Sequence, residues 1–119
     1  MSVRKLIAHE RALDLVVLVY RETSKLPSSE KFGLYSQMRR AAISVPSNLA
    51  EGHGRSGTNE YIRFIDIALG SLRELETQVE ICKRLGFFES KELVDLMDNV
   101  GKLYYGIRKG LKEKLNCTA

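Results

Sequence analysis

The amino-acid sequence predicts an all-α protein, an antiparallel up-and-down four-helix bundle. Four segments carry apolar residues at steps of three and four, the period of one helix face, and no segment shows the sustained alternation of a strand. Short turns separate the segments, so neighbouring helices should run antiparallel. With 119 residues, 44% of them hydrophobic, the chain is expected to form a single domain, residues 1–119, around one core.

The first helix is expected over residues 3–25 and is apolar around most of its circumference. One stripe carries residues spaced seven apart, Leu6, Leu13 and Tyr20. Another set points elsewhere and consists of Leu15, Leu18 and Val19. Because a helix of a monomeric bundle needs only one buried stripe, we expect the second set to contact a neighbouring copy in a homo-oligomer.

The second helix is expected to start near Ser28, because Pro27 disfavours helix before it and a serine can cap the first turn of a helix. Its inward residues are expected to be Leu34, Met38, Ala41, Ala42, Val45 and Leu49. Pro46 falls inside this pattern and lacks a backbone N–H, so the helix should kink or loosen around it. The glycine-rich segment 52–57 should end the helix.

The third and fourth helices have the most regular patterns. Over residues 58–85, apolar residues alternate steps of four and three as in a heptad seam, and Gly86 provides the stop signal. Over residues 89–115, one side is expected to carry Leu93, Leu96, Val100, Leu103, Ile107 and Leu111. Both segments are therefore expected to pack as long helices of the bundle.

The segment from Gln37 to Gly52, QMRRAAISVPSNLAEG, resembles the signature of the bacterial four-helix bundle proteins encoded in intervening sequences of 23S ribosomal RNA genes. The resemblance extends through Leu26-Pro27, Gly33-Leu34, Tyr61, Phe64, Ala68, Gly70-Ser71 and Glu74-Leu75-Glu76. It implies a four-helix protomer that assembles into a ring-shaped homopentamer. A related group, the accessory variability determinants of diversity-generating retroelements, has the same architecture and binds nucleic acid and a reverse transcriptase through a basic surface.

The net charge of +4 is concentrated near the C-terminus. Residues 102–114 contain one acidic side chain, Glu113, and five basic ones: Lys102, Arg108, Lys109, Lys112 and Lys114. These cations could meet RNA or DNA. They could equally complement the dipole at the C-terminal end of a helix.

Arg39 and Arg40 are a second candidate contact to nucleic acid, since guanidinium groups grip phosphates with paired hydrogen bonds. The favoured interpretation is a structural pairing with carboxylates, within or between protomers. The candidate carboxylates are Glu51, Glu74 and Glu76. Asn48 is expected to be a buried hydrogen-bonding residue that sets helix register. For stacking on bases, Tyr35 and Tyr105 are available, whereas Tyr61 and Tyr104 belong to the expected core.

The spacing Gly52-x-Gly54-x-x-Gly57 matches the dinucleotide fingerprint G-x-G-x-x-G. That fingerprint requires a preceding strand, and here a helix precedes it. The favoured interpretation is a turn between helices in which the glycines adopt positive φ angles. Binding of an anion at the start of the next helix stays open, with Arg55 as the contributing cation.

The sequence contains no group of residues at the spacing of a catalytic or metal-binding site. His9 and His53 are isolated, and Cys82 and Cys117 form neither a C-x-x-C motif nor a disulfide framework. We expect no catalytic residues, no metal and no cofactor. The longest apolar stretch, residues 12–20, is too short to cross a bilayer, and no signal peptide is recognisable, so a cytoplasmic location is expected.

These observations predict a non-catalytic homo-oligomeric binding or scaffold protein. The first candidate partner is nucleic acid, in particular structured RNA. The alternative is a homo-oligomeric protein-interaction module with no nucleic-acid role.

Overall fold

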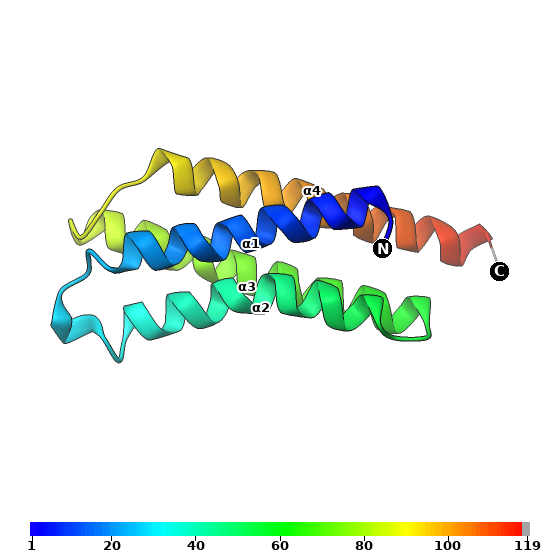
Figure 1. Ribbon diagram of the computed structural model, residues 1–119, viewed down its shortest axis with the longest axis horizontal. Helices are drawn as coiled ribbons and strands as arrows, with labels where there is room; N and C mark the ends of the chain where they lie inside the picture. The colour runs from blue at the N-terminus through cyan, green and yellow to red at the C-terminus, as the bar shows by residue number, and fades with distance from the viewer. Residues whose placement is uncertain (118–119) are drawn as a thin grey trace.

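A computed structural model describes residues 1–117 and contains four long helices lying side by side (Figure 1). They are α1 (Val3–Thr23), α2 (Leu34–His53), α3 (Thr58–Arg84) and α4 (Lys91–Cys117), and a short 3-10 helix, η1 (Ser28–Glu30), precedes α2. α1 contacts α2 and α4, and α3 contacts the same two helices, so the bundle closes around one core. Successive helices run in opposite directions (Figure 1). The predicted all-α up-and-down four-helix bundle is confirmed.

The apolar seams predicted for the second, third and fourth helices face this core. Their largest fully buried side chains are Met38, Val45, Leu49, Ile65, Leu75, Leu93, Val100 and Tyr104. Each buried side chain of this size stabilises the fold by about 1.5–3 kcal/mol relative to exposure. Tyr61 is buried as well, so the assignment of Tyr61 and Tyr104 to the core is confirmed.

α1 buries a different face from the one predicted. Leu15, Leu18 and Val19 lie in the core of the protomer, so the expectation that they contact a neighbouring copy is wrong. The buried seam also contains Ala8 and Ala12, which precede Leu15 and Val19 at steps of four and three. Helices approach according to the size of the side chains between them, so small alanines are suited to this seam. The opposite, exposed side carries Leu6, Leu13, Val17 and Tyr20.

The entry into α2 also differs from the prediction. Ser28 begins the short η1, and α2 itself begins at Leu34, after Gly33. α2 then continues through the buried Pro46 to His53. The Tyr104 hydroxyl of α4 donates a hydrogen bond of 3.1 Å to the carbonyl oxygen of Val45, beside the proline.

The glycines between α2 and α3 do not adopt the predicted positive φ angles. Within residues 1–117, Gly86 after α3 is the glycine with positive φ, at 76°. Gly52 is instead buried where α3 crosses α2. A Cβ atom on Gly52 would lie 2.9 Å from Cδ1 of Tyr61 and 3.0 Å from Cβ of Phe64. The glycine is required for close packing of two helices, not for a turn or a phosphate.

Candidate assembly and nucleic-acid surfaces

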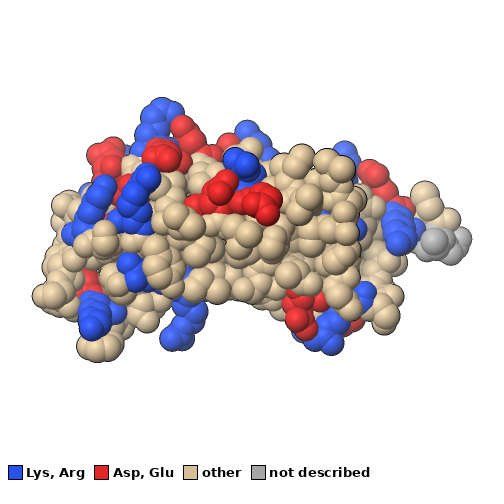
Figure 2. Space-filling view, viewed as in Figure 1, with Lys and Arg blue, Asp and Glu red and all other residues tan. Residues whose placement is uncertain are grey.

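The exposed side of α1 forms an outer apolar stripe, which we define as Val3, Leu6, Leu13 and Val17. Val17 is 70% exposed, and no part of the described protomer covers it. Figure 2 shows an uncharged area along the middle of this face, with a group of acidic and basic side chains above it. Beside the stripe, α1 and α2 enclose an open hollow of about 350 Å³ whose lining includes Leu13, Val16, Ile43 and Pro46. The stripe is therefore continuous with an apolar groove.

The basic residues near the end of α4 are partly neutralised by acids of the same chain. Nζ of Lys102 lies 3.0 Å from a carboxylate oxygen of Asp98. Nε of Arg108 lies 2.6 Å from the Asp66 carboxylate of α3, so this arginine ties α4 to α3. Lys109, Lys112 and Lys114 are exposed, and the first two form no ion pair within residues 1–117. The predicted cationic surface is thereby reduced to the last turns of α4.

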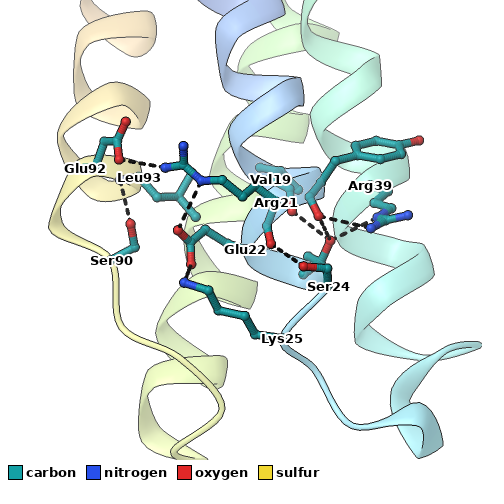
Figure 3. Close-up of polar contacts among 11 residues, drawn as sticks. Val19, Arg21, Glu22, Ser24, Lys25, Arg39, Ser90, Glu92 and Leu93 are labelled. Atoms are coloured by element: carbon teal, nitrogen blue, oxygen red, sulfur yellow. Dashed lines mark hydrogen bonds and ion pairs between the residues drawn. The ribbon is translucent and has the colours of Figure 1, made fainter.

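Arg39 contacts the end of α1 rather than a carboxylate. Its Nε donates to Oγ1 of Thr23 at 2.9 Å, and its Nη2 donates to the carbonyl oxygen of Tyr20 at 3.1 Å (Figure 3). The Tyr20 carbonyl also accepts a hydrogen bond of 3.3 Å from the backbone N–H of Ser24, so the guanidinium group is a further donor at this helix end. The same group lies 4.0 Å from the ring centroid of Tyr20 and 3.7 Å from that of Tyr35.

Arg40 differs from its neighbour because it is exposed and forms no ion pair among the described residues. Within the described protomer, neither Arg39 nor Arg40 pairs with the carboxylates proposed, and pairing between protomers stays a prediction. Glu51 pairs with Arg55, Glu74 accepts a 3.2 Å hydrogen bond from Nε2 of Gln78, and Glu76 lies in a groove between α3 and α4. The Glu51 pair also occupies Arg55, the cation expected to assist anion binding.

Asn48 is half-buried and takes part in a polar link between α2 and α3. Its Nδ2 donates to the carbonyl oxygen and to Oγ of Ser44, both at 2.8 Å. The Ser44 hydroxyl lies 2.7 Å from the hydroxyl of Ser71 on α3. Asn48 thus acts on helix register through Ser44 rather than directly.

Two clusters were missed by the sequence interpretation. Arg21 lies between the buried Glu22 of α1 and Glu92 of α4, and Lys25 pairs with Glu22 at 2.6 Å (Figure 3). The signal for this network was the position of Glu22, which extends the buried seam of α1. The second cluster is a hollow at the corner between α1 and α2, lined in part by Tyr20, Lys31, Phe32, Tyr35, Arg39 and Arg40.

The side chains that could bind a metal or act as nucleophiles are dispersed over the described part of the chain. Within residues 1–117, no three His, Cys, Asp or Glu side chains are grouped so that they could hold a metal ion. Cys82 is buried and Cys117 exposed, and neither forms a disulfide in the described chain. Burial, assisted by the charge of Glu30, raises the pKa of the Cys82 thiol and keeps it protonated at neutral pH. Across the same residues, no helix is long and apolar enough to span a bilayer.

The fold and these surfaces define a class: a four-helix bundle whose candidate sites all lie on its outside. The chain belongs to the 23S rRNA-intervening sequence protein family, whose model matches residues 4–108. It is similar to the crystal structure of a protein of unknown function from the S23 ribosomal protein family of Bacteroides thetaiotaomicron, with a TM-score of 0.80. The two chains share 20% identity over 90% of this chain and 99% of the other, which supports the fold alone. Comparison with curated proteins gave no match.

Proposed function

We propose that this chain is a non-catalytic scaffold protein that works as a homo-oligomer. The observation that carries the proposal is the outer apolar stripe of α1. Val3 and Val17 are 14 residue steps apart on one helix, so the stripe extends over about 21 Å at about 1.5 Å per residue. The exposed Glu10 lies between Leu6 and Leu13 on the same side of the helix, so the stripe consists of two apolar stretches, Val3 with Leu6 and Leu13 with Val17. Exposed apolar side chains grouped in this way can mark an interaction site.

A second copy of the chain is the partner that we propose for this stripe. A straight apolar ridge beside a groove is the form that another helix packs against. The family resemblance implies a ring of five protomers, and a closed ring would cover the stripe of every protomer. We therefore propose that the stripe is the assembly surface.

The substitution Val17→Asp tests the assembly surface. Because Val17 is 70% exposed in the protomer, the variant should fold, and its helical circular dichroism should match the wild type. Light scattering after size exclusion should then report a smaller mass than for the wild type. The matched control is Ile67→Asp on the exposed side of α3, the helix that does not contact α1. A Val17→Asp variant of unchanged mass would contradict the proposed surface.

Nucleic acid is the second part of the proposed function, and the cations at the end of α4 favour it. Lys109 and Lys112 are three residues apart, so both lie on one side of the helix. Exposed lysines without ion pairs can neutralise phosphates, and such binding weakens as salt rises. The paired states of Lys102, Arg55 and Arg108 favour the alternative, a protein-interaction module with no nucleic-acid role.

Fluorescence anisotropy with a structured RNA hairpin and a DNA duplex tests whether the partner is nucleic acid or another protein. At low salt the wild type should bind, and the double variant Lys109→Ala, Lys112→Ala should bind more weakly with a shallower salt dependence. Binding that survives the double variant unchanged would exclude the end of α4 as the site. An oligomer that binds neither probe at low salt would support the protein-interaction module.

A further inference from the structure

The hollow at the corner between α1 and α2 has an unusual composition. It is open, has a volume of about 480 Å³, and combines three aromatic side chains with three cations. These six residues, which we call the aromatic corner, are Tyr20, Lys31, Phe32, Tyr35, Arg39 and Arg40. None of the residues lining the hollow is acidic.

Phe32 is the feature of this corner that packing does not explain. It lies in the loop between η1 and α2 and is 90% exposed, more than any other large apolar side chain of the described residues. Nζ of Lys31 lies 5.7 Å from the centre of its ring. The ring is therefore open to a flat partner, with a positive charge beside it.

Arg39 holds the other side of the corner in place. It stacks between the rings of Tyr20 and Tyr35, and its hydrogen bonds to the end of α1 fix its orientation. Arg39 is thus a positioning residue that keeps two rings and one charge at the edge of the hollow. The exposed Arg40 follows it and is available for contact with an anion.

The nearest acid of the loop does not neutralise these cations. Glu30 does not line the hollow. It forms no ion pair with a described residue, and its Oε1 lies 3.3 Å from the position that a Cβ atom on Gly33 would take. Lys31 and Arg40 have no ion pair with any described residue, so two cations flank the exposed Phe32 ring without compensation.

We propose that the aromatic corner binds an unpaired nucleotide of single-stranded nucleic acid. The base stacks on Phe32, and the flanking phosphates contact Lys31 and Arg40. Aromatic side chains beside cations are the usual platform for single strands, because every base has a flat face on which to stack. A duplex hides those faces, and an acidic peptide would use the cations while leaving the Phe32 ring bare.

This inference deepens the nucleic-acid part of the proposed function, but it uses a different end of the molecule. The α1–α2 loop and the C-terminal end of α4 lie at opposite ends of the bundle (Figure 1). In the same view, several Lys and Arg side chains gather at the end that contains the loop (Figure 2). Binding at the two ends can therefore be separated by substitution.

The variant Phe32→Trp provides a direct signal, since the chain contains no tryptophan. We expect a single-stranded oligouridylate to quench the emission of the introduced indole at low salt, and a blunt duplex of the same length to leave it unchanged. By anisotropy, Phe32→Ala should weaken binding of the single strand by roughly tenfold. Tyr105→Ala removes the exposed ring of α4 that the sequence also offered for stacking, so it tests the rival position, and the proposal predicts an unchanged affinity for it.

The salt dependence of binding tests the role of the cations. Losing one phosphate contact to a single strand should reduce the slope of log K against log salt by about 0.7, and this is the result expected for Arg40→Gln. If the single strand binds but the indole emission does not change, or if Phe32→Ala and Tyr105→Ala behave alike, the corner is not the site. Loss of that binding in Lys109→Ala, Lys112→Ala would then locate it on α4. A wild type that binds no probe at low salt overturns both nucleic-acid sites and leaves the assembly proposal standing.

Discussion

α1 and α3 bury similar apolar seams in the core, but their exposed sides differ. Each buries a seam with steps of four and three, which runs through Ala12, Leu15 and Val19 in α1 and through Ala68, Leu72 and Leu75 in α3. The outer side of α3 carries charged pairs, Arg63 with Glu60 at 3.0 Å and Arg84 with Glu80 at 2.9 Å. The outer side of α1 carries the outer apolar stripe.

The difference is one of degree: α3 exposes Ile67 and Ile81, each 41% exposed, whereas α1 exposes Val3 at 75% and Val17 at 70%. Charged pairs on an exposed helix keep it solvated and contribute little to stability. An exposed apolar stripe contributes nothing to the protomer that bears it and becomes useful only when another surface covers it. The proposed assembly surface is therefore on the outer side of α1.

The largest effect is expected from breaking the buried side of α1. Leu15 is fully buried, so Leu15→Ala should lower the free energy of unfolding by about 2–5 kcal/mol through lost burial and a cavity. Urea denaturation followed by circular dichroism measures the change. Ile67→Ala, on the exposed side of α3, is the control and should change it by less than about 1 kcal/mol. Equal effects of the two substitutions would contradict the assignment of the inner face of α1.

A smaller loss is expected where α2 and α3 touch. Gly52→Ala would place Cβ against Tyr61 and Phe64, and overpacking of this kind costs about 1–3 kcal/mol. Gly57→Ala is a matched control, because no atom lies within 4 Å of its added Cβ. Thermal unfolding of both variants compares them directly, and a Gly52→Ala variant as stable as Gly57→Ala would show that α3 can shift to accept a methyl group.

The smallest effect is expected at the corner between α1 and α2. Arg39→Met removes two hydrogen bonds to the end of α1 and the stacking on Tyr20 and Tyr35, and should cost about 1 kcal/mol. Arg40→Met should stay within about 0.5 kcal/mol, since Arg40 has no ion pair in the described protomer. Denaturant midpoints of the pair test this, and a larger loss for Arg40→Met than for Arg39→Met would reverse the roles of the two arginines.

The sequence predicted the four helices and the inner faces of three of them, because each of those three has one apolar side. It failed on α1, where Leu13 and Leu15 lie on opposite sides and both are apolar. Periodicity cannot choose between two such faces, and the choice depends on how Ala8 and Ala12 fit against the neighbouring helices. The same limit applied to Gly52, whose role depends on the distance between two helices.

The sequence indicated which residues could form a site, but not which atoms they contact. Arg39 was singled out, yet its acceptors are a backbone carbonyl and the hydroxyl of Thr23, which have no distinguishing pattern in a sequence. Arg108 and Lys102 were candidate contacts to nucleic acid, but Asp66 and Asp98 form ion pairs with them. Phe32 was overlooked because only the structure shows that its ring is outside the core.

The most direct test of the assembly claim is the mass of the intact wild-type protein in native mass spectrometry across a range of concentrations. Exposure of the outer apolar stripe predicts a measured mass of two or more protomers of 13.5 kDa each. The family resemblance leads us to expect five copies. A mass of 13.5 kDa at every concentration would show that the stripe stays uncovered by copies of this chain, and it would contradict the homo-oligomeric scaffold.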